Sequence, residues 1–349
     1  MSLLAHASSP TRLLTYFSIS IQSMPKRIGK PGVVFFLRLG IAVFLILVIL
    51  RMVDFHDMGV TFASVKPHLI VTGLLIMLLN YCLKTYRWAL ILWIRRPEIP
   101  FGQLARFNFV SIFLGSFLPS SVSADIVRVY YVSQHTADPR AAISSIFADR
   151  IIGTFSLAIV TTAAFLVLLE TELFPIGSIL SYGIGALLLL TLALPLTLRN
   201  RAVLHSITQL VERFAGRRLF AGVQDMSDHL RSYGSAGAVM IKVLSISFVN
   251  LFIAVLEFYL IAKGFSTQVS IGYFLVFIPL VIFLATLPVS VGGMGLVEAG
   301  LVFFFSKIGM PLEMCFGTAL VYRALQLTCM LPGAAIYLFN GFSIKELSV

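Results

Sequence analysis

Charged side chains are scarce in this chain. Only 12% of its residues are Asp, Glu, Lys or Arg, against about a quarter in soluble globular domains. Hydrophobic residues make up 58% of the 349 positions. This composition argues against a soluble enzyme and predicts an integral membrane protein.

Residue types that bind metals or act in catalysis are also few. The three cysteines, Cys82, Cys315 and Cys329, lie in apolar segments at no metal-ligand spacing, which is typical of small core residues. The six histidines fall in loops or at the ends of apolar segments, and no nucleophile–base pair stands out. We therefore expect no metal, no cofactor and no catalytic residue.

Long apolar segments are what the sequence does contain. Several are close to or above the roughly 20 residues that cross a bilayer as a helix. They predict an all-α integral membrane protein with about six spans: 33–53, 69–94, 146–169, 177–197, 238–262 and 314–340. Residues 1–32 show no cleavable signal pattern, so we expect a cytoplasmic N-terminal segment, with Met24 as an alternative start, before one transmembrane domain, 33–349.

Two further apolar runs, about 107–119 and 271–287, end in similar short sequence motifs. The first runs into LPSSVSADIVR and the second into LPVSVGGMGLVE. In each, a proline stops the incoming helix, and serines or glycines suit a helix cap or a tight turn. The alternative is two ordinary proline kinks and a chance repetition.

The basic residues flank the spans, so the net charge of +11 indicates topology rather than nucleic-acid binding. The Arg-rich loops 95–106 and 198–236 are expected in the cytoplasm, together with both termini. Both loops can lie in the cytoplasm only if residues 104–135 form a re-entrant hairpin that enters the membrane from the cytoplasmic side and returns to it. The segment 271–308 then forms a second hairpin, or two crossings, open to the outer side.

These segments form two units of the same order, 69–169 and 238–340. The single span 177–197 between them turns the second unit upside down. Inverted repeats with interrupted helices at matching positions are typical of transporters. We expect the two breaks to meet near the membrane midplane and to form a binding site there.

Charged residues inside spans cost about 2.5–3.5 kcal/mol each on insertion scales, so they indicate partners, water or function. Near the breaks arginines outnumber acids, and guanidinium groups and helix N-termini both favour phosphate. Arg150 and Arg323 occupy similar places in the two units, which suggests symmetry partners. The candidate ligand is an anion, and in a bundle open to the bilayer a lipid phosphate is favoured.

The candidate substrate-binding residues are Arg87, Pro119, Ser120, Ser121, Asp125, Arg128, Arg150, Pro288, Ser290, Gly292, Gly293 and Arg323. Asp125, Asp149 and Glu298 are candidates for proton coupling, because burial and a neighbouring arginine act in opposite directions on an acid. Structural roles stay open for some of them. Arg87 suits snorkelling to headgroups, and Asp125 suits the dipole of a helix N-terminus.

Four motifs carry a family resemblance. NYCLKTYRW, FLGSFLPSSVSADIVR, ADRIIG and LPVSVGGMGLVE resemble, in this order, the membrane region of lysylphosphatidylglycerol synthases and related stand-alone flippase-like proteins. The resemblance covers roughly 69–340 and implies a lipid-translocating bundle with two re-entrant helices. The family often has Gly-Glu where this chain has Ala124-Asp125. No aminoacyl-transferase domain follows, so we do not expect that activity.

The sequence thus predicts a flippase that moves an anionic or phosphate-bearing lipid across the bacterial inner membrane. Aminoacyl-phosphatidylglycerol, a polyprenyl-phosphate-linked sugar and a hopanoid-related lipid are all open as cargo. Membrane lipids are the expected partners, with no nucleic acid, and a homo-oligomer is compatible with the sequence. An integral membrane lipid-modifying enzyme and a small-solute transporter are the alternatives.

Overall fold

The computed structural model describes residues 65–116, 123–136, 138–169, 237–287 and 290–339, with isolated positions among residues 40–59 and Gly185. Every regular element within these ranges is helical, which confirms the all-α prediction for this part of the chain. The segment 1–32 and nearly all of the expected spans 33–53 and 177–197 lie outside the described residues.

Long apolar helices make up most of the described structure. Four stretches are long and apolar enough to cross a bilayer: α4 (Pro67–Trp93), α7 (Pro139–Leu169), α11 (Gly237–Gly264) and the α14–α15 pair (Leu312–Thr328 and Leu331–Phe339). The chain is a multi-pass membrane protein. The expected spans 69–94 and 238–262 agree with α4 and α11 to within a few residues. The last expected span, 314–340, agrees with the α14–α15 pair, which has a short break after Thr328 because Pro332 has no backbone N–H to continue the helix.

Helix α7 begins at Pro139, earlier than the predicted start at residue 146. Asp138 accepts a hydrogen bond from the Ala141 backbone N–H at 3.1 Å, and proline suits the first helical position. Arg96, just after α4, donates from Nε to Asp138 Oδ2 at 3.2 Å. Burial raises the pKa of Asp138, but the hydrogen bonds from Arg96 and from the Ala141 and Arg140 backbone outweigh it and lower that pKa. The end of α4 is thereby joined to the start of α7.

The remaining helices are short: α5 (Phe101–Ser116), α6 (Ser123–Thr136), α12 (Ile271–Thr286), the single turn η1 (Val291–Gly293) and α13 (Leu296–Ser306). At 1.5 Å per residue, α5, α6, α12 and α13 extend about 16 to 24 Å, less than the roughly 30 Å hydrocarbon core. These lengths favour re-entrant hairpins over full crossings. We call α5–α6 the first hairpin and α12–α13 the second hairpin.

Small residues shape both hairpins. A Cβ on Gly115, near the end of α5, would lie 2.7 Å from the Ala124 backbone, so the two helices approach there because Gly115 has no side chain. In the second hairpin Leu287 is extended, as expected before a proline. Positive φ angles at Gly292, Gly293 and Gly295 then turn the chain into α13, which only glycine adopts readily.

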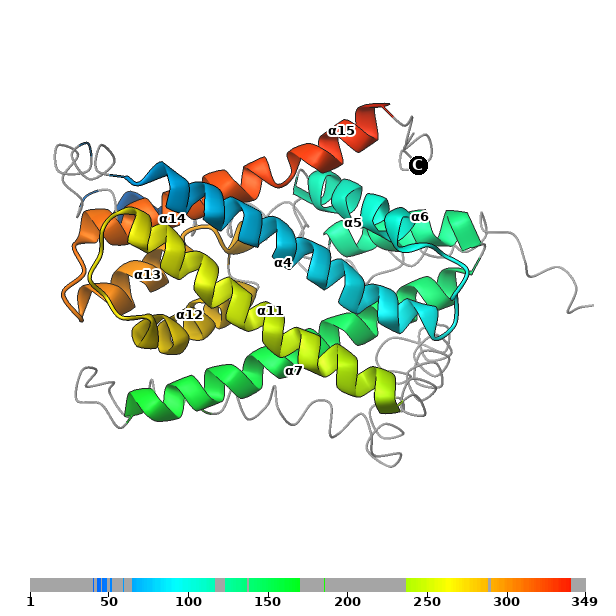
Figure 1. Cartoon of the computed structure of the whole chain (residues 1–349), viewed down its shortest axis with the longest axis horizontal. Coiled ribbons are helices and arrows are strands. Elements are labelled where there is room, and N and C mark those ends of the chain that lie inside the picture. Colours follow the sequence, from blue (N-terminus) through cyan, green and yellow to red (C-terminus); the bar gives the residue numbers. More distant parts are fainter. Residues whose placement is uncertain are drawn as a thin grey trace, which may run out of the picture.

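Helices α4 and α11 lie side by side and antiparallel through the middle of the molecule (Figure 1). The Lys66 backbone N–H donates to the Gly264 carbonyl at 2.9 Å and joins the start of one to the end of the other. The first hairpin packs on α15, and α12 of the second hairpin packs on α7, with the two hairpins toward opposite ends of the long helices (Figure 1). An inverted repeat requires such reciprocal contacts, and the repeat itself stays a prediction.

Gly115→Ala tests the close approach within the first hairpin. The new methyl group meets backbone rather than a flexible side chain, so the hairpin must open, at a cost of about 1–3 kcal/mol. We expect a clearly lower melting temperature in detergent. Gly102→Ala on the same helix is the control, since nothing lies within 4 Å of its Cβ position, and it should be neutral. Equal melting temperatures for the two variants would contradict the packing.

Candidate functional site

Each hairpin contributes one acid to an ion pair with a long helix. Asp125 is the third residue of α6 and bonds to Arg150 of α7, 25 residues later. Glu298 is the third residue of α13 and bonds to Arg323 of α14, also 25 residues later, with Oε1 and Nε 2.9 Å apart. The matching spacing and helix positions are those expected of Arg150 and Arg323 as symmetry partners, which stays a prediction.

In the first hairpin, Asp125 accepts hydrogen bonds from two arginines, Arg128 and Arg150. Two arginines against one aspartate leave the cluster with a formal charge of +1. The Arg128 guanidinium lies 5.3 Å from the ring centroid of Trp88, a cation–π contact. Trp88 is fully buried and donates to Ser145 Oγ at 3.2 Å, so it forms a fixed wall behind Arg128.

In the second hairpin, Glu298 also accepts from the Gly295 backbone N–H at 2.7 Å. Arg323 donates from Nη1 to the Gly292 carbonyl at 3.3 Å and to Gln326 Oε1 at 3.1 Å. One acid and one arginine make this pair formally neutral. The guanidinium thereby links α14 to the glycine turn that precedes α13.

Two buried donors in these clusters lack a partner among the residues that the structure describes. They are Nε of Arg128 and Nη2 of Arg323. A buried donor of this kind is costly unless water or a ligand satisfies it. The helix N-termini, by contrast, already hold carboxylates in their first turns. The helix N-termini are therefore less available to an anionic ligand than the sequence suggested, and the free donors of the two arginines are the better candidates.

Arg87 and Asp149 form a third ion pair, between α4 and α7. Arg87 Nε lies 2.7 Å from Asp149 Oδ1, and Nη1 donates to Ser247 Oγ of α11 at 3.1 Å. The side chains are only 12% and 9% exposed, so Arg87 points into the bundle rather than out to headgroups. A Cβ on Gly153 would lie 3.2 Å from the guanidinium, which therefore fits because that residue is glycine.

The other candidate residues are placed as follows. Ser290 is buried, and its hydroxyl has no partner in the described part of the chain. Gly292 is exposed and Gly293 is buried against Ala285. Pro119, Ser120, Ser121 and Pro288 lie outside the described residues. The meeting of the two breaks at the midplane therefore stays a prediction.

Sequence reasoning did not find the groups that hold these arginines. Trp88, Ser247 and Gly153 each contact an arginine from a different helix. Ser247 is 160 residues from Arg87 along the chain, so no local pattern joins them. The sequence contained one signal for the ion pairs, the 25-residue spacing between acid and arginine. That spacing can be recognised only once the pairs are known.

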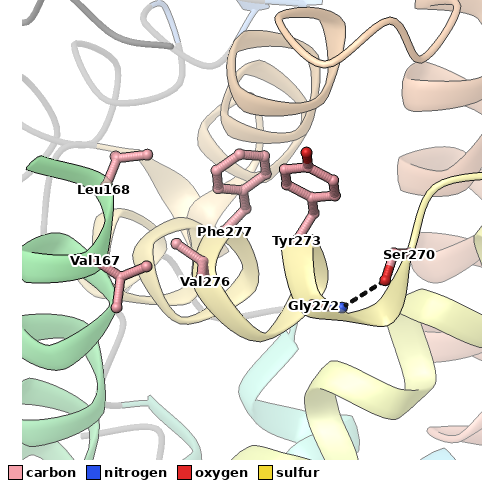
Figure 2. Close-up of a pocket in the computed structure, with 7 residues that line it drawn as sticks. All are labelled: Val167, Leu168, Ser270, Gly272, Tyr273, Val276 and Phe277. Carbon is pink, nitrogen blue, oxygen red and sulfur yellow. Dashed lines mark hydrogen bonds between the residues drawn. The ribbon is translucent and has the colours of Figure 1, made fainter. Parts of the chain in front are cut away.

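A cavity of about 200 Å³ lies apart from these charges, between the end of α7 and the start of α12. Figure 2 shows Val167 and Leu168 of α7 on one side and Val276 and Phe277 of α12 on the other. The Ser270 hydroxyl accepts from the Gly272 N–H at 3.3 Å and begins α12. Val167 is about 27 Å along α7 from Asp149, so the cavity is not part of the ion-pair site.

Comparison with known proteins identifies the family. The sequence model described as the lysylphosphatidylglycerol synthase TM region matches residues 35–333. The chain belongs to this family. This confirms the predicted resemblance and extends it toward the N-terminus. A UPF0104 membrane protein of Methanothermobacter thermautotrophicus is 22% identical over 302 residues, which cover 80% of this chain and 88% of that protein. No solved structure matches.

Asp149→Asn should destabilise the protein strongly, because it leaves the Arg87 guanidinium buried without its counter-ion, at a cost of about 3–5 kcal/mol. Asp138→Asn is the matched control in the more exposed pair with Arg96. Asparagine still caps α7, so the loss should be about 0–1 kcal/mol. Thermal unfolding in detergent at neutral pH measures both.

The control has its own pH signature. The lowered pKa of Asp138 means that its contribution is complete above the ordinary pKa of aspartate, about 3.9, and is lost as pH falls through the lower folded value. The difference between wild type and Asp138→Asn should therefore vanish only in strong acid. Equal destabilisation by the two substitutions at neutral pH would show that Asp149 has no special role in α4–α7 packing.

Proposed function

We propose that this protein binds the phosphate group of an anionic membrane lipid at Arg128 and Arg323 and moves the lipid across the bacterial inner membrane. The observation that carries the proposal is that each arginine is held by a hairpin acid and still has a buried, unpartnered N–H donor. Such a guanidinium is oriented before the ligand arrives, and its remaining donor suits a phosphate oxygen.

Charge supports an anion rather than a cation. The Asp125 cluster has a formal charge of +1, whereas the Glu298 and Asp149 pairs are neutral. An anion that enters the bundle therefore gains most at the first hairpin. The family description names lysylphosphatidylglycerol, a phospholipid, which supports a lipid over a small solute as cargo.

The reciprocal packing of the hairpins supports translocation rather than binding alone. Each hairpin contacts the last long helix of the opposite half, and the two lie toward opposite ends of the molecule. In transporters built from inverted repeats, rocking of one half against the other exposes a central site to either side in turn. The two arginine clusters are then the positions between which a phosphate moves.

Arg128→Ala and Arg323→Ala should each weaken binding of the anionic lipid about 10- to 100-fold, the range expected for loss of a charge-assisted hydrogen bond. The measurement is mass spectrometry of lipids that co-purify in mild detergent, followed by fluorescent-lipid translocation in proteoliposomes. Arg106→Ala, an exposed arginine on α5, is the control and should retain the lipid.

Loss of Arg323 also leaves Glu298 without its partner, so folding must be tested separately. Arg323→Lys keeps the charge but not the fork, and it should fold normally while binding the lipid more weakly. Wild-type levels of the same lipid in both alanine variants would refute the anion site. A wild type that retains only bulk lipid would favour a small-solute transporter or an enzyme.

A further inference from the structure

A row of polar residues runs along the contact between α4 and α11, two otherwise apolar helices. It comprises Asn80, Lys84, Arg87, Ser247, Asn250 and Glu257, and we call it the polar seam. Because α4 and α11 are antiparallel, the start of each helix lies beside the end of the other. Arg87 meets Ser247 at one end, and Asn80 lies beside Glu257 at the other.

The two ends of the polar seam differ in charge balance. Arg87 pairs with Asp149, the residue directly before Arg150. Glu257 instead faces Tyr322, the residue directly before Arg323. Arg87 therefore has a counter-ion from α7, whereas Glu257 has only the neutral phenol of Tyr322 at the corresponding position.

Glu257 is 3% exposed, and its Oε1 has no hydrogen-bond partner among the described residues. It forms no ion pair within the described ranges. Its nearest cation is Lys84, whose ammonium also lies over the Tyr81 ring at 5.6 Å. An ionised carboxylate in this setting is expensive, and a proton neutralises it.

The titratable groups around Glu257 come from the helices packed on α11. Lys84 and Tyr81 face it from α4, and Tyr322 and Cys329 face it from the α14 side. On α7, Asp149 is paired with Arg87, Arg150 is paired with Asp125, and Arg140 lies near the helix start. On α12 the titratable residue is Tyr273, whose ring packs on Phe277. Arg323 is held by Glu298.

Unsatisfied amide groups lie along the polar seam next to this carboxylate. Asn80 Oδ1 and both amide atoms of Asn250 are buried without a partner among the described residues. Buried polar atoms of this kind are commonly satisfied by internal water. Water along the polar seam would connect Glu257 to Lys84 and, past Asn250, toward Arg87.

We propose that Glu257 is a proton-binding site and that the polar seam supplies its water path. When Glu257 is ionised, Lys84 provides the compensating charge across the α4–α11 contact. When it takes up a proton from solution, that attraction is lost and the contact between the two halves weakens. As the coupling site of lipid movement, this assignment rests on the proposed function. It also moves proton coupling away from Asp125, Asp149 and Glu298, each of which is ion-paired with arginine.

The first test needs no transport. Infrared difference spectra of the purified protein, recorded during a pH titration, should contain a protonated carboxylic-acid band that Glu257→Gln removes. Glu98→Gln, in the exposed loop after α4, is the control and should leave the band in place. Lys84→Gln keeps Glu257 and should shift the pH at which the band disappears upward, because it removes the stabilising cation. A band that is absent in wild type, or unchanged in Glu257→Gln, overturns the site.

The second test separates coupling from lipid movement. Proteoliposomes of phosphatidylcholine and phosphatidylglycerol with a fluorescent phosphatidylglycerol are placed under a pH gradient. Wild type should respond to the gradient, whereas Glu257→Gln should fold, bind lipid and lose the response. Translocation in wild type that ignores the gradient overturns the coupling. No translocation at all, with the infrared band present, defeats the proposed function but leaves the proton site.

Discussion

The cost of burying an ionised side chain is the constraint on which this bundle depends. A guanidinium inside the low-dielectric bundle is tolerated only when an acid and further hydrogen bonds meet it there. Arg87 and Arg323 each find that acid on a different helix, so each pair fixes how two helices lie against one another. The pairs thus specify register in a bundle whose apolar faces alone would allow sliding.

The same constraint orients the functional groups. Asp125 and Glu298 orient their arginines, and one further donor on each, Nε of Arg128 and Nη2 of Arg323, has no partner within the described structure. The first hairpin keeps an excess positive charge and the second is balanced. In the proposed function, a phosphate that binds at one cluster and then at the other therefore meets two positions of unequal formal charge.

The sequence predicted the long helices α4 and α11 closely, because their apolar length can be read directly from the chain. Pro332, by contrast, divides a span that apolar length alone had joined, and Asp138 starts α7 early inside a polar stretch that hydropathy could not assign. The predicted equivalence of Arg150 and Arg323 was visible in their placement, yet their acids were candidates without partners. Gly115 and Gly153 matter only for what approaches them, and that approach comes from residues distant in sequence or on another helix.

The two ends of the α4–α11 contact differ in how well their polar groups are satisfied, and this gives the two ends different mechanical roles in the proposed function. At the Arg87 end, an arginine, an aspartate and a serine from three helices satisfy one another, and that junction has no reason to open. At the Glu257 end, the acid has a phenol, Lys84 and incompletely satisfied amides around it but no ion pair within the described residues, so in the proposal the strength of the contact depends on a single proton. In the proposed function, the two halves rock about the Arg87 junction while the contact at Glu257 loosens. The polar seam places a fixed junction and the proposed titratable junction on the same pair of helices, and in this mechanism a proton at Glu257 favours one arrangement of the halves over the other.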